Sequence, residues 1–270
     1  MADRHPEPMR AQEWRLPWRG ASRVTHALLD ILRGCNVTCR ACYNSRPPHC
    51  KTLEEIRADL DVLMAHRRLQ SVSLVGGEVT MHPDLCRIVE MVRARGLFAE
   101  LFSNGVLLDD RLLSRLKRAG ADLICLHVEA GQQRPDLPAN ASAHEVRRLQ
   151  SGLAERVAAH GLEVGLAETI FDDAWDEVAE TVRFVIDSPH LTFLVATLHR
   201  DHGNIRSIRG SLCSKMRGDL NRAEDESQKG SRSNLDVARQ LFDRLGLRPF
   251  AYLESDRKST RLNSSHVSQS

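Results

Sequence analysis

The chain has 270 residues, of which 41% are hydrophobic and 27% charged, and this is the composition of a globular protein that can bury a core without disulfide bonds. Lys and Arg number 38 against 36 Asp and Glu, and the aromatic residues are seven Phe, three Trp and two Tyr. This composition excludes a strong overall electrostatic case for binding nucleic acid or a membrane, and it disfavours a base-stacking surface.

The N-terminal part of the sequence carries no visible targeting segment. Residues 1–20 lack the apolar stretch of a secretory signal, and no run of about 18 apolar residues occurs in the chain. Seven cysteines without a secretion signal indicate a reducing compartment, so we expect a cytoplasmic protein whose cysteines are ligands, catalysts or core residues. Residues 1–24 show no clean periodicity and are predicted to be an N-terminal extension.

From about residue 25, short apolar runs alternate with amphipathic helical segments. The runs have the length of strands and are almost continuously apolar, which is typical of parallel strands covered on both faces. They lie at residues 27–32, 71–75, 98–103, 122–128, 163–170 and 191–198. Helices are predicted after the capping boxes at Thr52 and Ser142, after Pro83 and Asp109, and after Asp173.

Six β–α units in succession predict an α/β fold with a parallel sheet over residues 25–198. A partial or complete (β/α) barrel is the favoured closure of this sheet, and a doubly wound open sheet is the alternative. Residues 199–232 are rich in Arg, Ser, Gly, Asp and Asn and are predicted to be a polar, disordered linker. Residues 233–255 are predicted to hold a last helix, at about 234–245, and the start of a further segment.

The end of the chain departs from this pattern. Residues 256–266, from Asp256 to His266, resemble the translation of a widely used sequencing adaptor. We therefore expect residues 256–270 to be non-native and the natural C-terminus to be missing.

Three cysteines, Cys35, Cys39 and Cys42, follow the first predicted strand with the spacing C-x3-C-x2-C. Chemistry in parallel α/β folds collects at the carboxyl ends of the strands, where this loop lies. Three thiolates can hold three irons of a [4Fe–4S] cube and leave the fourth iron open to an external ligand. Cys50 could supply a fourth ligand instead, and a zinc site with His49 and Cys50 as its second half is an alternative.

Further polar residues follow the later strands. Gly76-Gly77-Glu78 comes after the second strand, where its glycines allow a close backbone approach, and taken alone it would be a common turn. Asn104, in Ser103-Asn104-Gly105, follows the third strand, and its simplest interpretation is a turn. Glu129 ends the fourth strand. Glu168, near the end of the fifth, is a weaker candidate, as are His199 and His202, which could line a substrate mouth or simply be exposed.

The cysteine spacing, followed one β–α unit later by Gly76-Gly77-Glu78, resembles the radical S-adenosylmethionine (radical SAM) superfamily over residues 25–198. The resemblance implies a partial (β/α)6 TIM-like barrel in which Cys35, Cys39 and Cys42 bind a [4Fe–4S] cluster. Many members carry an aromatic residue directly before the third cysteine, whereas this sequence has Ala41 there and Tyr43 after it. The implied S-adenosylmethionine contacts are Gly76, Gly77, Glu78, Asn104, Glu129 and Tyr43. Of these, the resemblance implies that Glu78 meets the ammonium group of the methionine moiety and that Glu129 contacts the ribose.

The resemblance also implies an activity. S-adenosylmethionine would be cleaved reductively to methionine and a 5′-deoxyadenosyl radical, which abstracts hydrogen from a small-molecule, lipid or peptide substrate, with electrons from a donor such as a flavodoxin or ferredoxin. A non-catalytic zinc- or iron–sulfur-binding regulatory module is the alternative. A metal-dependent hydrolase would need His and Asp clusters at the strand ends, which here supply Cys and Glu. The loop Gln132–Asp136 receives no assigned ligand.

Overall fold

The computed structural model describes residues 25–40, 42, 44, 49–199 and 234–247. Their six strands are β1 (His26–Leu32), β2 (Ser71–Gly76), β3 (Phe98–Ser103), β4 (Leu123–His127), β5 (Glu163–Ile170) and β6 (Leu191–Leu198). The α-helices are α1 (Leu53–His66), α2 (Leu85–Arg93), α3 (Asp110–Ala119), α4 (Ala143–Ala159), α5 (Val178–Asp187) and α8 (Asn234–Leu245). Two short 3-10 helices, η3 (Val79–Met81) and η4 (Asp172–Glu177), complete the order.

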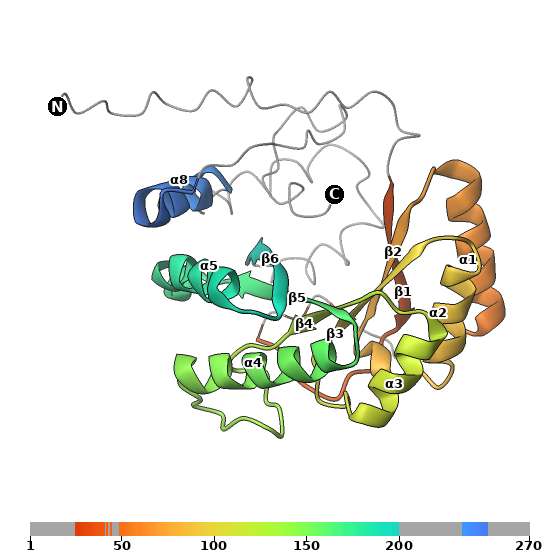
Figure 1. The fold of residues 1–270 in the computed structure, drawn as a ribbon, viewed down its shortest axis with the longest axis horizontal. Helices are drawn as coiled ribbons and strands as arrows, with labels where there is room; N and C mark the ends of the chain where they lie inside the picture. The colour runs from red at the N-terminus through yellow and green to blue at the C-terminus, as the bar shows by residue number, and fades with distance from the viewer. Residues whose placement is uncertain (1–24, 41, 43, 45–48, 200–233, 248–270) are drawn as a thin grey trace, which may run out of the picture.

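The strands form one sheet in the order β1-β2-β3-β4-β5-β6, and every pair is parallel. This order has no reversal, so the doubly wound alternative is excluded. The described strands leave β1 and β6 at opposite edges, and the sheet is therefore an unclosed barrel (Figure 1). The predicted partial (β/α)6 barrel is confirmed.

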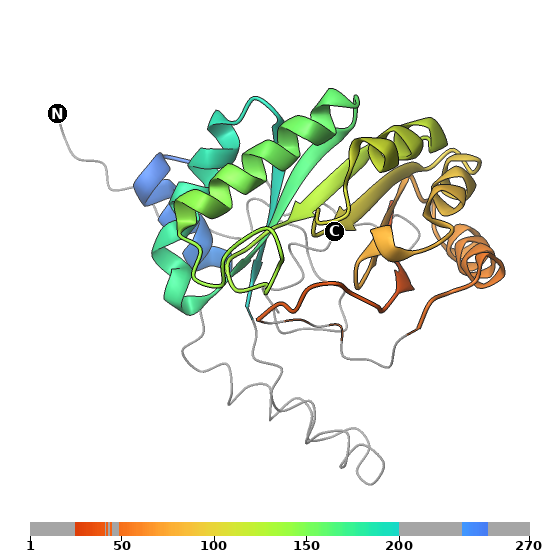
Figure 2. The same ribbon diagram turned by 90° about the horizontal axis from the view of Figure 1, so that it is seen from below.

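Alternate residues of the strands face opposite sides of the sheet, and the larger core lies on the helix side (Figure 2). On β4, Ile124 and Leu126 are fully buried in this core together with residues of the helices. Their neighbours Leu123 and Cys125 belong to a smaller cluster on the other face, with the partly buried Phe98 and Phe102. The strands are thus apolar on both faces, which explains their continuous apolar runs.

The helix ends follow local signals in most places. Thr52 and Ser142 each form both halves of a capping box, and the Asp109 side chain caps α3. Two boundaries differ from the prediction. The helix expected to open at Pro83 begins at Leu85, because residues 82–84 form a turn in which the Asp84 N–H donates to the His82 ring.

The second difference precedes α5, where residues 172–177 form η4 rather than the first turns of the helix. The last predicted helix forms as α8, and its Val237 and Leu241 pack with Ile170, Val178 and Leu198. Among the described residues, no helix combines the length and apolar character that a membrane crossing requires. Predictions for residues 1–24, 200–233 and 248–270 lie outside the described residues.

Candidate functional site

The cysteine loop, residues 33–40, crosses the carboxyl edge of the sheet and is held there by the backbones of other loops. Thr38 N donates to Gln132 O at 2.9 Å, and Glu78 N donates to Gly34 O at 2.8 Å. At the end of this loop, Arg40 lies 2.8 Å from the carboxylate of Asp173 and over the ring of Phe171, two residues that follow β5. The loop therefore reaches from β1 to the residues that follow β5.

The three predicted ligands lie close enough for the charges of Cys39 and Cys42 to act on Cys35. Cys35 and Cys42 are exposed and Cys39 is half-buried. Burial raises the pKa of Cys35, Val37 N–H lowers it, and the charges of Glu78, Cys39 and Cys42 raise it further. Within the described ranges, no three Cys, His, Asp or Glu side chains already form a metal-ligating group. Ala41 and Tyr43 lie outside these ranges, so the position of Tyr43 stays a prediction.

Gly76 and Gly77 bring the end of β2 against the cysteine loop. A Cβ atom on Gly76, whose φ is +149°, would lie 2.0 Å from Leu32 O. A Cβ on Gly77 would lie 2.0 Å from Gly34 O, while Gly77 N donates to Leu32 O at 2.6 Å. The sequence suggested that these glycines admit a ligand. In the structure the backbone that approaches them is that of residues 32–34.

Glu78 is completely buried and accepts four hydrogen bonds. Thr80 donates its N–H at 3.1 Å and its hydroxyl at 2.5 Å, Ser103 Oγ donates at 2.7 Å, and Asn104 N donates at 2.7 Å. Oε1 accepts three of these bonds and Oε2 accepts one, so both carboxylate oxygens are engaged within the chain. Glu78 joins the end of β2 to the end of β3, and its contact with an ammonium group stays a prediction.

Asn104 forms the turn that its sequence suggests and also reaches the cysteine loop. Its Oδ1 accepts from Val106 N at 3.0 Å, and Gly105 follows with a φ of +80°. Its Nδ2 donates to Asn36 Oδ1 at 2.7 Å and lies 3.9 Å from Cys35 Sγ. The side chain is therefore both a turn former and a neighbour of the first cysteine.

The loop after β4, Gln132–Asp136, which the sequence named without assigning it a ligand, contributes two buried residues. Gln132 is 1% exposed, and its Nε2 lies 3.6 Å from Cys39 Sγ. Arg134 is 4% exposed, donates to both oxygens of Asp136, and donates to Gln132 Oε1 and Asn104 O at 2.9 Å each. Burial raises the pKa of Asp136, but the Arg134 guanidinium outweighs it and holds that pKa below its usual range.

His127 and Glu129, at the end of β4, form an ion pair with Nε2 and Oε1 2.9 Å apart. Burial lowers the pKa of His127, but hydrogen bonds to Cys39 and Glu129 and their negative charges raise it to about 10. Glu129 also accepts from Thr169 N. Glu129 and Gln132 together line a cavity of about 260 Å³, whose walls are formed by residues 129–134 and 137–139. The predicted contact of Glu129 with a ribose stays a prediction.

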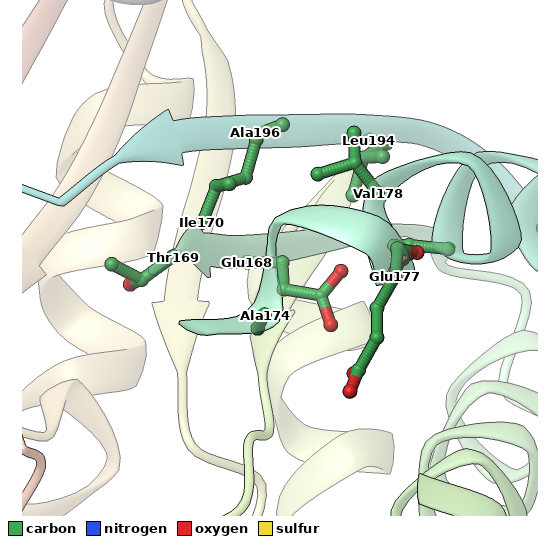
Figure 3. Close-up of a pocket in the computed structure, with 9 residues that line it drawn as sticks. Glu168, Thr169, Ile170, Ala174, Glu177, Val178, Leu194 and Ala196 are labelled. Carbon is green, nitrogen blue, oxygen red and sulfur yellow. Dashed lines mark hydrogen bonds between the residues drawn. The ribbon is translucent and has the colours of Figure 1, made fainter. Parts of the chain in front are cut away.

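Glu168 is not part of this arrangement. It lies in a pocket on the helix side of β5, near Glu177 (Figure 3), and 3.4 Å from Arg147. Burial raises the pKa of its carboxyl, and the Arg147 charge opposes the shift. The next residue, Thr169, donates its backbone N–H to Glu129. Its side chain lies on the other face of the sheet, because successive residues of a strand alternate between the two faces. His199 stacks on Phe171, and His202 lies outside the described residues.

The chain is similar to several known proteins. It is 33% identical over 121 residues to a PqqA peptide cyclase of Gluconobacter oxydans, covering 40% of this chain and 32% of that protein. It is 24% identical over 189 residues to the tungsten-containing aldehyde ferredoxin oxidoreductase cofactor-modifying protein of Pyrococcus furiosus, covering 65% of this chain and 52% of that protein. The chain thus spans about a third to a half of these relatives.

Similarity in structure extends further. Streptococcus suis SuiB bound to S-adenosylmethionine superposes with a TM-score of 0.57 at 16% identity, covering 90% of this chain and 53% of that chain. At this identity the likeness shows the fold alone. The family model of the Radical SAM superfamily matches residues 29–185, which is more than half of the chain. The chain therefore belongs to the radical SAM superfamily, whose members bind a [4Fe–4S] cluster and S-adenosylmethionine.

Proposed function

We propose that this chain is a radical SAM enzyme that holds a [4Fe–4S] cluster through Cys35, Cys39 and Cys42. The observation that carries the proposal is that amide N–H groups lie beside two of these three sulfurs. Asn104 Nδ2 lies 3.9 Å from Cys35 Sγ, and Gln132 Nε2 lies 3.6 Å from Cys39 Sγ. Thiolates that accept hydrogen bonds from a surrounding shell are the donor set of an iron–sulfur cluster.

The cofactor supplies the difficult chemistry. When bound, the reduced cluster and S-adenosylmethionine provide methionine and a 5′-deoxyadenosyl radical that abstracts hydrogen from the substrate. The chain positions these groups, and the two glycines set the cysteine loop against β2. Glu78 and Asn104 fix the neighbouring strand ends, and Glu129 faces the 260 Å³ cavity in which a ribose contact is proposed.

The reaction partners belong to the same proposal. We expect a small-molecule, lipid or peptide substrate and a flavodoxin or ferredoxin as electron donor. One relative is named a peptide cyclase, but the chain covers only 32% of it. An oxygen-sensitive cluster also fits the reducing, cytoplasmic compartment that the cysteine content favours.

The test is anaerobic reconstitution of the wild type with iron and sulfide, followed by reduction in the presence of S-adenosylmethionine. The wild type should show broad visible absorbance and release 5′-deoxyadenosine. Cys39→Ala should lose both, whereas Cys50→Ala should keep them. Undiminished iron and absorbance in Cys39→Ala would contradict the ligand assignment. A cluster that leaves S-adenosylmethionine intact, or a colourless zinc protein, would favour the regulatory module.

A further inference from the structure

Gln132 is a buried side chain that the proposed function places beside a cysteine sulfur without giving it an effect on the cluster. An uncharged amide at 1% exposure needs partners for one oxygen and two hydrogens. Its Nε2 lies 3.6 Å from Cys39 Sγ, which is a hydrogen-bond distance for an acceptor as large as sulfur. The question is whether this nitrogen faces the sulfur by necessity.

The partners of Oε1 fix the orientation of the amide. Oε1 accepts from Glu129 N at 3.1 Å and from Arg134 Nη1 at 2.9 Å. A flipped amide would point its NH2 group at these two donors, so the nitrogen must face Cys39. Nε2 also lies 3.1 Å from His127 O and 3.3 Å from His127 Nδ1. One hydrogen can serve the His127 carbonyl, and the other has the His127 ring nitrogen and the Cys39 sulfur within reach.

The surroundings hold Gln132 against the cysteine loop in two ways. Its backbone O accepts from Thr38 N at 2.9 Å, next to Cys39 in the sequence. Its side chain is held by Arg134, which Asp136 pairs at 2.5 and 2.9 Å. The amide is therefore held beside the sulfur by the chain itself, and it does not titrate, so its capacity to donate does not change with pH.

We propose that Gln132 donates its amide N–H to the Cys39 thiolate and thereby raises the reduction potential of the cluster. The inference rests on the proposed function, because it requires Cys39 as a cluster ligand. One-electron reduction adds a negative charge that spreads onto the ligand sulfurs. A donor on the sulfur stabilises the reduced form more than the oxidised form and so raises the potential. Gln132 is a positioning residue that acts through Cys39.

The test compares Gln132→Met with Gln133→Met, which makes the same change at the adjacent, exposed side chain. Each reconstituted protein is reduced stepwise with dithionite or titanium citrate, and the reduced cluster is followed by electron paramagnetic resonance. Gln132→Met should have a more negative midpoint potential than the wild type, at equal iron and sulfide content. Gln133→Met should match the wild type. An unshifted midpoint in fully loaded Gln132→Met overturns the proposal.

A second variant keeps the test decisive if the methionine disturbs folding. Gln132→Glu retains oxygens for Glu129 N and Arg134 but removes the donor, and Gln133→Glu adds the same charge nearby. The midpoint of Gln132→Glu should fall below that of Gln133→Glu, and equal values overturn the role. Failure of both Gln132 variants to bind iron would make the residue structural and overturn it as well. A wild type that binds no cluster contradicts the proposed function itself, which separates the two failures.

Discussion

The Glu78 carboxylate is completely buried and accepts hydrogen bonds from residues that follow β2 and from residues at the end of β3. It therefore joins the ends of the two strands. A buried ion is tolerated only where its acceptor positions are filled. Gly77, beside it, contributes the opposite property, the absence of a side chain. Together they set the distance between the cysteine loop and the sheet.

Replacing Glu78 by Gln should destabilise the fold. The amide keeps its oxygen for the three donors at the Oε1 position and turns an NH2 group toward Asn104 N, which loses its acceptor. Leaving a buried donor unpaired costs about 1–3 kcal/mol. Urea unfolding should show this loss, whereas Glu90→Gln on the exposed side of α2 should unfold at the wild-type concentration. Equal midpoints for both variants would refute this account of Glu78.

Gly77→Ala should separate the cysteine loop from β2. The new methyl group would lie 2.0 Å from Gly34 O, and backbone rather than a flexible side chain must move. We expect a loss of about 1–3 kcal/mol in stability, as for overpacking, together with reduced iron uptake on reconstitution. Gly152→Ala is the matched control, because a Cβ at Gly152 meets no atom within 4 Å and alanine favours helix α4. Wild-type iron uptake by Gly77→Ala would contradict the steric argument.

At the scale of elements, a hydrogen bond and an ion pair fix the loop after β4 relative to its neighbours. Arg134, almost fully buried, joins this loop to the turn after β3 through Asn104 O and is itself neutralised by Asp136. The same loop also binds the cysteine loop, because the Gln132 backbone O accepts a hydrogen bond from Thr38 N. Three loops from different strands are thereby fixed relative to one another.

The stability contributed by Asp136 should depend on pH in a defined direction. Its pKa in the folded protein is lowered by Arg134, so its contribution is complete above the unfolded pKa of about 3.9 and is lost as the pH falls through the lower folded pKa. Asp136→Asn should therefore unfold at lower urea concentration than the wild type at pH 7. The gap should narrow below about pH 4. A gap that stays constant over this range would speak against the ion pair as its source.

The elements themselves were predictable where their signals are local. The strand predicted at 98–103 forms over those residues, and the Thr52 and Ser142 capping boxes form as expected. The assignments of Gly76-Gly77-Glu78 and of the three cysteines also depend on local spacing, and their roles stay predictions. The burial of Gln132 and Arg134 was not predictable, because nothing local indicates that polar side chains in a loop will be buried. Their burial results from contacts with strands β3 and β4 and with a loop more than 90 residues away, from Gln132 to Cys39.

Over the whole molecule, different interactions stabilise the unclosed sheet and the loop that crosses its carboxyl edge. The helix-side core is continuous under α1 to α5 and does not include Cys35, Cys39 or Cys42. The crossing loop depends on hydrogen bonds such as Thr38 N to Gln132 O and on the Arg40–Asp173 pair. The fold should therefore survive changes that loosen the loop.

Removing the cluster with a chelator and an oxidant should test this separation. Residues 33–40 should exchange their amide hydrogens faster in the stripped protein, because the thiols no longer hold the loop, while α4 and β4 keep their protection. Hydrogen exchange measured by mass spectrometry on both forms gives the comparison, and far-UV circular dichroism should stay the same. Uniform loss of protection over the sheet would show that the cluster supports the fold as a whole.

The contact between Arg40 and Asp173 also has a consequence for the order of synthesis. The two residues are 133 positions apart, so the ribosome makes the cysteines long before Asp173, which pairs with Arg40 of their loop. Gln132, the partner of Thr38, is likewise made after the cysteines. On a growing chain the three thiols are therefore made before these two partners of their loop. Among the described residues, both contacts can form only after β5 and the residues that follow it have been synthesised.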